Sequence, residues 1–111
     1  MMNIRQQQKN GIQIIELEGR MDIDGVTQLD RVLENANSDG QYKAILDMGG
    51  VVYLNSASLH TLARYQQTYQ KKGGDLRLAK LSPIVQRVFQ MVGFRRFFRN
   101  YSTVDAAMLG L

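Results

Sequence analysis

Ser56 is the side chain whose setting gives it a chemical use. It stands in the segment Asn55–Leu59, a run of small polar residues that follows the strand-like segment Val51–Leu54. This order predicts a turn that delivers Ser56 to the start of a helix. A phosphate on its hydroxyl would add about −1.5 to −2 charges at the positive end of the helix dipole. The helix would tolerate that group, whereas a protein pressed against it would be repelled, so the segment predicts a modification switch.

The remaining reactive side chains form no pattern of a catalytic or metal site. His60 is the only histidine, and it lies inside the helix expected after Ser56, without the glycine-framed turn of a hydrolase nucleophile. Asp22 and Asp24 are close in sequence but lack the spacing and the glycine of a calcium loop. One of them is better explained as the cap of the following helix. We therefore expect no enzyme activity, no metal and no cofactor.

Basic residues gather in the second part of the chain. Residues 64–111 carry nine basic and two acidic side chains, whereas residues 1–63 carry five basic and eight acidic ones. Arg95, Arg96 and Arg99 alternate with aromatic residues, a pattern that could stack bases and neutralise phosphates. The alternative, which we favour, is that the aromatic side chains complete the core while the arginines face water. No direct contact with nucleic acid is therefore expected.

Length and composition are those of a soluble domain. The chain has 111 residues, of which 44% are apolar and 22% charged, and it has no cysteine. No apolar run approaches the roughly 20 residues that span a bilayer. The first residues, with Arg5 and Lys9, lack the apolar core of a signal peptide. We expect a cytoplasmic protein without membrane insertion.

Strand and helix patterns alternate around Ser56. Runs of β-branched and apolar residues predict strands at 3–8, 11–18, 42–48, 75–79 and 97–98. Apolar residues spaced by three and four predict helices from Asp22 or Asp24 to 36, at 56–72, from Ser82-Pro83 to 92 and at 103–109. Lys9-Asn10-Gly11 predicts a hairpin turn. The pairs Gly49-Gly50 and Gly73-Gly74 fit no phosphate-loop pattern and are expected to be turns.

Together these elements predict an α/β fold. Because strand and helix alternate with short connections, residues 1–111 should form a single domain. Its sheet should be mixed, mostly parallel and four- to five-stranded, with about four helices packed on it. This arrangement places the segment Asn55–Leu59 at the end of a central strand.

Four boxes stand in a fixed order along the chain: Gly19-Arg20-Met21-Asp22, Asn55–Leu59, Gly73-Gly74-Asp75-Leu76 and Ser82-Pro83-x-Val85-x-Arg87-Val88-Phe89-x-Met91-x-Gly93-Phe94. They resemble the STAS domain, and within it the anti-sigma factor antagonists of bacteria. The first box resembles the family's Gly-x-Leu-Asp signature, and the second its Asp-Ser-Ser/Ala/Thr-Gly-Leu box. The resemblance covers nearly the whole chain.

The resemblance implies a partner-switching function. In that family the unmodified protein binds an anti-sigma factor with serine-kinase activity, and the sigma factor is released. The kinase then phosphorylates the serine of the second box, which ends the contact, and a phosphatase restores it. By position that serine is Ser56. The partner-binding residues implied are Asp22, Asn55, Ser56, Ala57, Ser58 and Leu59.

Two residues of the second box depart from the family pattern. Asn55 replaces an acidic residue, which removes a charge beside Ser56, and Ser58 replaces a glycine. Ser58 thereby becomes a rival phosphate acceptor. An alternative function follows, in which the chain is a constitutive STAS scaffold subunit of a transport or sensory complex and Ser56 only caps a helix.

Overall fold

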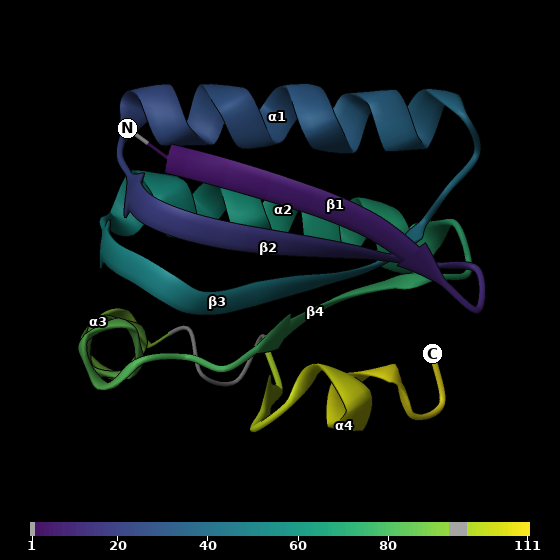
Figure 1. Ribbon diagram of the computed structural model, residues 1–111. Coiled ribbons are helices and arrows are strands. Elements are labelled where there is room, and N and C mark those ends of the chain that lie inside the picture. Colours follow the sequence, from purple (N-terminus) through teal and green to yellow (C-terminus); the bar gives the residue numbers. More distant parts are fainter. Residues whose placement is uncertain (1, 94–97) are drawn as a thin grey trace.

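Five strands form one sheet in the computed structural model, which describes residues 2–93 and 98–111. The strands are β1 (Met2–Lys9), β2 (Ile12–Met21), β3 (Lys43–Leu54), β4 (Asp75–Ala79) and β5 (Asn100–Tyr101). The helices are α1 (Ile23–Ser38), α2 (Ser56–Lys71), α3 (Pro83–Val92) and α4 (Val104–Met108). Strands lie side by side in the order of the chain, and Figure 1 shows the helices packed around them.

The sheet is mixed and mostly parallel, which confirms the predicted fold class. β1 and β2 are antiparallel, and their turn places Asn10 and Gly11 at φ values of 56° and 75°. Asparagine and glycine accept positive φ more readily than other residues, so the predicted hairpin forms here. β2, β3, β4 and β5 pair in parallel.

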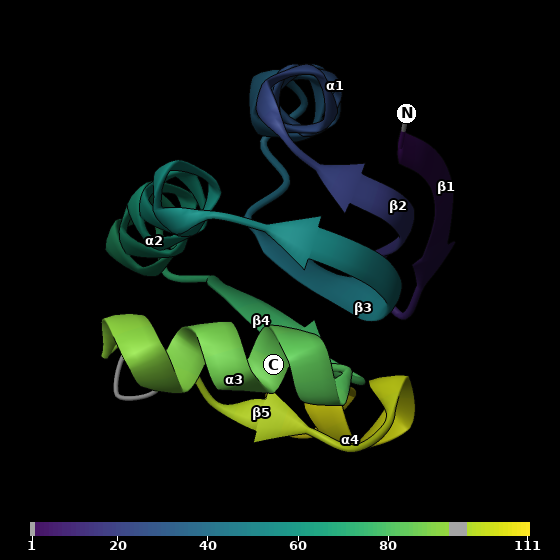
Figure 2. The ribbon, with the colours of Figure 1, turned by 90° about the vertical axis from the view of Figure 1, so that its left-hand side faces the viewer.

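Helices cover both faces of the sheet. Figure 2, which looks toward the strand ends, shows α1, α2 and α3 on one face and α4 on the other. The larger core lies under the first three helices and contains fully buried side chains such as Leu17, Leu46 and Leu59. A smaller core, including Ile45 and Ala107, lies under α4. The central strand β3 contributes to both cores, since its successive side chains point to opposite faces.

β3 is longer than the sequence predicts, because it continues through Gly49 and Gly50 to Leu54. The expectation of a turn at this glycine pair is wrong. The register with β2 shifts before Glu18, which marks a β-bulge. Asp47 Oδ1 accepts a hydrogen bond from the Gly49 N–H at 3.0 Å, and a Cβ on Gly50 would lie 3.0 Å from Glu18 Cγ. The glycines therefore let β3 bend close to β2 without ending.

The last strand comes later in the chain than expected. β5 (Asn100–Tyr101) pairs with β4, whereas a strand was predicted at 97–98. That prediction is wrong for Phe98, and Phe97 lies outside the described residues. Phe98 is buried, with its ring centroid 6.1 Å from that of Phe89 on α3. Aromatic residues favour strands because they pack well on a half-buried surface, and here the core beside α3 offers that packing instead.

The helices begin and end at the residues that the sequence marks. The Asp22 side chain accepts a hydrogen bond from the Gly25 N–H at 3.0 Å and caps α1. Ser82 caps α3, which ends at Gly93 with φ of 72°. Thr103 caps α4. Each cap satisfies a backbone N–H that lacks a partner within its helix, so these predictions are confirmed.

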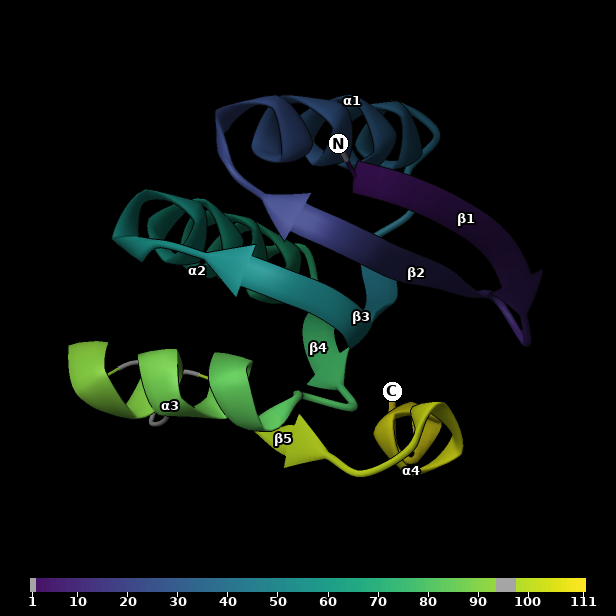
Figure 3. The same cartoon turned by 60° about the vertical axis from the view of Figure 1, so that its left-hand side comes forward.

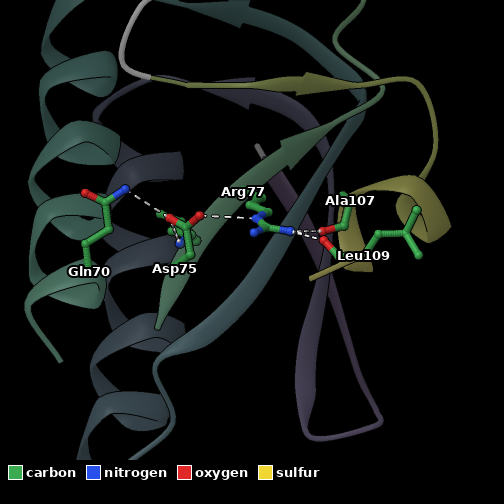
Figure 4. A network of polar contacts seen from close by, with 6 residues as sticks. Gln70, Asp75, Arg77, Ala107 and Leu109 are labelled. Atoms are coloured by element: carbon green, nitrogen blue, oxygen red, sulfur yellow. Dashed lines mark hydrogen bonds and ion pairs between the residues drawn. The ribbon is translucent and has the colours of Figure 1, made fainter. Parts of the chain in front are cut away.

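Arg77 fastens the last helix to the sheet. Its Nη1 donates to the carbonyl oxygens of Ala107 and Leu109 at 3.0 and 2.7 Å, and its Nε lies 3.1 Å from Asp75 Oδ2 (Figure 4). Gln70 of α2 donates to Asp75 from the other side at 3.3 Å. The last carbonyl groups of a helix lack intrahelical partners, and a cation satisfies them well. This network therefore holds α4 against its face of the sheet.

Candidate functional site

The candidate site lies where three parallel strands end. β2, β3 and β4 point the same way, so their carboxyl ends lie along one border of the sheet, which we call the C-terminal edge. Asp22 follows β2, Asn55 and Ser56 follow β3, and α3 follows β4. In Figure 3 β2 and β3 run toward this edge, and α1 and α2 begin there. The topology thus brings Asp22 and Ser56 to the same end of the molecule.

Asn55 and Ser58 form a reciprocal cap at the start of α2. The Ser58 N–H donates to Asn55 Oδ1, and the Asn55 N–H donates to Ser58 Oγ, both at 2.9 Å. The Ser58 hydroxyl also donates to the Asn55 carbonyl oxygen at 2.7 Å. This is a capping box, in which two orphan backbone donors are satisfied at once. The two residues that depart from the family pattern therefore depend on each other.

The structure places the two serines of this segment in different environments. Ser56 is exposed as the first residue of α2, whereas Ser58 is 1% exposed. Ser56 is not the cap of α2, because Asn55 occupies that position. The interpretation of Ser56 as a simple helix cap is therefore wrong, and Ser56 is a solvent-exposed residue.

Asp22 is held in place from two sides. Its Oδ1 caps α1 through the Gly25 N–H, and its Oδ2 lies 3.8 Å from Arg20 Nε. The hydrogen bond from Gly25, with a smaller contribution from the Arg20 charge, lowers the pKa of the Asp22 carboxyl below its usual value. Asp22 is therefore an anion with a fixed orientation at the C-terminal edge.

Arg20 and Tyr53 connect the two helix starts, and the sequence analysis did not assign either of them to the site. The Arg20 guanidinium lies 4.1 Å from the centre of the Tyr53 ring, a cation–π contact. Asn55 Nδ2 lies 3.3 Å from the Tyr53 hydroxyl. Asp22, Arg20, Tyr53 and Asn55 thus form one chain of contacts. Arg20 and Tyr53 are each the next-to-last residue of a strand. This shared position is the feature of the sequence that could have indicated their contact.

Ala57 is exposed beside Ser56, while Leu59 is fully buried in the core beneath α2. The surface at this place is therefore made by Ser56 and Ala57, and Leu59 supports it from below. His60 is exposed one turn further along the helix.

The structure gives no support to the two other kinds of site that the sequence analysis considered, a nucleic-acid surface and a metal site. Arg95 and Arg96 lie outside the described residues, and Arg99 is exposed beside the buried Phe98. Residues 2–93 and 98–111 bring no three metal-binding side chains together. Within the same ranges, no helix combines the length and apolar character needed to cross a bilayer.

Replacing Asn55 by Ala should destabilise the domain by about 1 kcal/mol, because the Ser58 N–H loses its acceptor at the start of α2. Urea denaturation measures the difference. Asn55→Asp is the matched control, since it keeps the acceptor and adds a charge that the helix dipole favours. If Asn55→Asp lost as much stability as Asn55→Ala, the cap would not be the reason for the loss.

Comparisons with known proteins agree with this geometry. The chain is 27% identical over 106 residues to BtrV of Bordetella bronchiseptica, which carries the provisional description of anti-sigma factor antagonist. The match covers 96% of this chain and 91% of BtrV. An anti-sigma factor antagonist from Mycobacterium paratuberculosis has a similar crystal structure, with a TM-score of 0.85, 20% identity and coverage of 97% of this chain and 92% of that one.

Two further kinds of protein share the fold. SpoIIAA, an anti-sigma factor antagonist, matches in its unphosphorylated form with a TM-score of 0.79, 19% identity and coverage of 96% and 93% of the two chains. Its phosphorylated form, from Bacillus, matches with a TM-score of 0.73, 18% identity and coverage of 96% of each chain. A sulfate transporter family protein of Wolinella succinogenes matches with a TM-score of 0.76, 23% identity and coverage of 92% and 85%.

The family assignment follows from the sequence itself as well as from the shape. Residues 3–107 match the model of the STAS domain, which includes all five strands from the second residue of β1 onward, and α1 to α3. The first two boxes that carry the resemblance lie at the C-terminal edge, and the fourth includes α3 next to it. The third, Gly73-Gly74-Asp75-Leu76, lies at the opposite end of the strands, where α2 leads into β4. This chain belongs to the STAS domain family.

Proposed function

We propose that this protein is an anti-sigma factor antagonist of a partner-switching pathway. In its unmodified form it binds an anti-sigma factor that is also a serine kinase, and phosphorylation of Ser56 ends the contact. The observation that carries this proposal is the exposure of Ser56 at the start of α2, where Asn55 fills the capping position. A serine that the fold does not need is free to be modified without unfolding the domain.

The proposal agrees with what is known of similar proteins. BtrV and the Mycobacterium protein are described as anti-sigma factor antagonists, and SpoIIAA has structures with and without phosphate. The role is one of binding and not of catalysis, and it is performed in the cytoplasm, where sigma factors act. A phosphatase would remove the phosphate and restore binding.

The contact surface surrounds Ser56 on the C-terminal edge. Asp22 contributes a fixed anion, Asn55 the neutral amide next to the acceptor, and Ala57 a small side chain that permits close approach. Ser58 is disfavoured as the rival acceptor, because its oxygen is buried and makes two hydrogen bonds in the cap. A kinase could reach it only after the first turn of α2 had opened.

Incubation with Mg-ATP and each purified anti-sigma factor kinase encoded in the same genome should add one phosphate to the protein. Tandem mass spectrometry should place it on Ser56, because this is the exposed serine at the start of α2. Ser56→Ala should abolish the modification, and Ser58→Ala should retain it. A phosphate on Ser58, or none with any of the kinases, would contradict the proposal.

A second function is favoured by one specific observation. The sulfate transporter family protein of Wolinella succinogenes shares this fold, and Asn55 leaves the acceptor without an adjacent charge. The chain could then be a constitutive scaffold subunit of a transport or sensory complex. Co-purification of the tagged protein with transporter subunits, unaffected by Ser56→Asp, would support that function over the switch.

A further inference from the structure

Arg20 is a half-exposed cation at the C-terminal edge. Its side chain is 53% exposed, although its guanidinium lies 4.1 Å from the centre of the Tyr53 ring. Arg20 and Tyr53 are paired residues of β2 and β3, and Figure 3 shows these strands ending side by side where α1 and α2 begin. The ring therefore supports the guanidinium from one side, while its other side remains open to solvent.

The contacts of Tyr53 lead from Arg20 to the residue before Ser56. The Tyr53 hydroxyl lies 3.3 Å from Asn55 Nδ2, and Asn55 immediately precedes Ser56 at the start of α2. A phosphate on Ser56 would extend beyond the serine hydroxyl and present three acceptor oxygens. The arginine side chain is long and carries five N–H donors. A rotation of the Arg20 side chain over the ring would therefore bring its donors to such a phosphate.

The present contact of Arg20 with an anion is weak. Its Nε lies 3.8 Å from Asp22 Oδ2, which is longer than a hydrogen bond, and both side chains are partly exposed. Exposed ion pairs of this kind contribute little to stability. The other oxygen of Asp22 accepts from the Gly25 N–H, so Asp22 keeps its place without Arg20. Arg20 can therefore leave Asp22 for a stronger anion at little cost.

Two other titratable side chains lie near Ser56. Asp22 is an anion and would repel a phosphate. His60 follows Ser56 by four residues on α2, a spacing at which helical side chains are neighbours, and it is exposed. Arg20 differs from His60 in two ways, because a guanidinium carries its charge at every physiological pH and can donate two parallel hydrogen bonds to a phosphate. Arg20 is therefore the better partner for a phosphate on Ser56.

We propose that Arg20 is the internal partner of the phosphate on Ser56. Its guanidinium leaves Asp22 and donates paired hydrogen bonds to the phosphoryl oxygens. This inference rests on the proposed function and adds a second consequence of phosphorylation to it. The contact surface gains a dianion and also loses a cation, and Asp22 is left without its ion pair. A carboxylate at position 56 is one bond shorter and has a single charge, so it should gain little from Arg20.

The test uses protein with phosphoserine incorporated at position 56 during translation, which needs no kinase. A pH titration followed by phosphorus NMR gives the second pKa of the phosphate. A guanidinium beside the phosphate favours the dianion and lowers this pKa. Arg20→Gln should therefore raise the pKa by about 0.5, which is about threefold in proton affinity, and Arg20→Lys should keep part of the lowering. Thermal melting verifies that each variant is folded.

Two control variants separate Arg20 from other charges. Arg31→Gln removes the same charge from an exposed position of α1, about 12 Å along the helix from Ile23, and should leave the pKa unchanged. His60→Gln should change it less than Arg20→Gln does. An unchanged pKa in Arg20→Gln, an equal change in Arg31→Gln or a larger change in His60→Gln would each overturn the role of Arg20.

The outcomes also separate the two proposals. The kinase incubations test whether Ser56 is modified at all, and their failure would overturn the proposed function together with the role of Arg20 in it. The titration needs neither a kinase nor an anti-sigma factor. If the kinases modify Ser56 and Arg20→Gln leaves the pKa of the phosphate unchanged, only the inference about Arg20 is wrong.

Discussion

Ser56→Asp is expected to weaken binding of the anti-sigma factor by about 100-fold, equivalent to about 2.8 kcal/mol. The reason is that a carboxylate at the start of α2 would be pressed, without a cationic partner, into a contact to which Asp22 already contributes a negative charge. Within its own helix the same charge is favourable, because it lies at the positive end of the dipole, and the domain should gain up to about 0.5 kcal/mol of stability. Calorimetry and urea denaturation measure the two quantities separately.

The control for charge is Ser56→Asn, which has nearly the size of Asp and no charge. It should lose much less affinity than Ser56→Asp, whereas equal losses would mean that bulk alone blocks the partner. The predicted combination of lost binding with retained stability is specific to a switch. A serine that supported the fold would lose stability together with binding.

Much of the candidate site could be predicted because its signals are local. Asp22, Ser82 and Thr103 cap helices with side chains that reach backbone groups three residues away, and such bonds depend on neighbouring sequence alone. The position of Ser56 at a helix start was predictable for the same reason. Which residue caps α2 was not predictable, because asparagine and serine are both good helix caps and only the structure shows whether Asn55 or Ser56 is used.

The parts that could not be predicted depend on residues distant in sequence. Gly49 and Gly50 have the composition of a turn, yet pairing with β2 carries β3 through them as a bulge. The stacking of Arg20 on Tyr53 joins two strands that are separated by a whole helix. Likewise, a helical pattern shows that α3 has an apolar face, but not how much of that face the core leaves uncovered.

Gly74→Ala is the substitution with the largest expected effect on stability. The Asp75 N–H donates to the carbonyl oxygen of Tyr42 at 3.0 Å, which draws the backbone before β4 close to the start of β3. A Cβ on Gly74 would overlap the carbonyl oxygen of Tyr42. Side-chain rotation cannot relieve this overlap, because the oxygen belongs to the backbone and the Cβ is bonded directly to it. We expect the free energy of unfolding to fall by about 3 kcal/mol, since β4 or the end of α2 must shift.

Gly73→Ala is the matched control, one residue earlier in the same connection. Gly73 has φ of 84° with no atom within 4 Å of an added Cβ, so only its left-handed backbone conformation opposes the change. That cost is about 1 kcal/mol. Gly73 and Gly74 donate to the carbonyl oxygens of Gln70 and Tyr69 at 3.1 and 2.9 Å, which is the hydrogen-bonding pattern of a Schellman motif. Urea denaturation should therefore rank Gly74→Ala well below Gly73→Ala, and similar losses would show that the glycine pair acts only through its backbone freedom, as the sequence alone suggests.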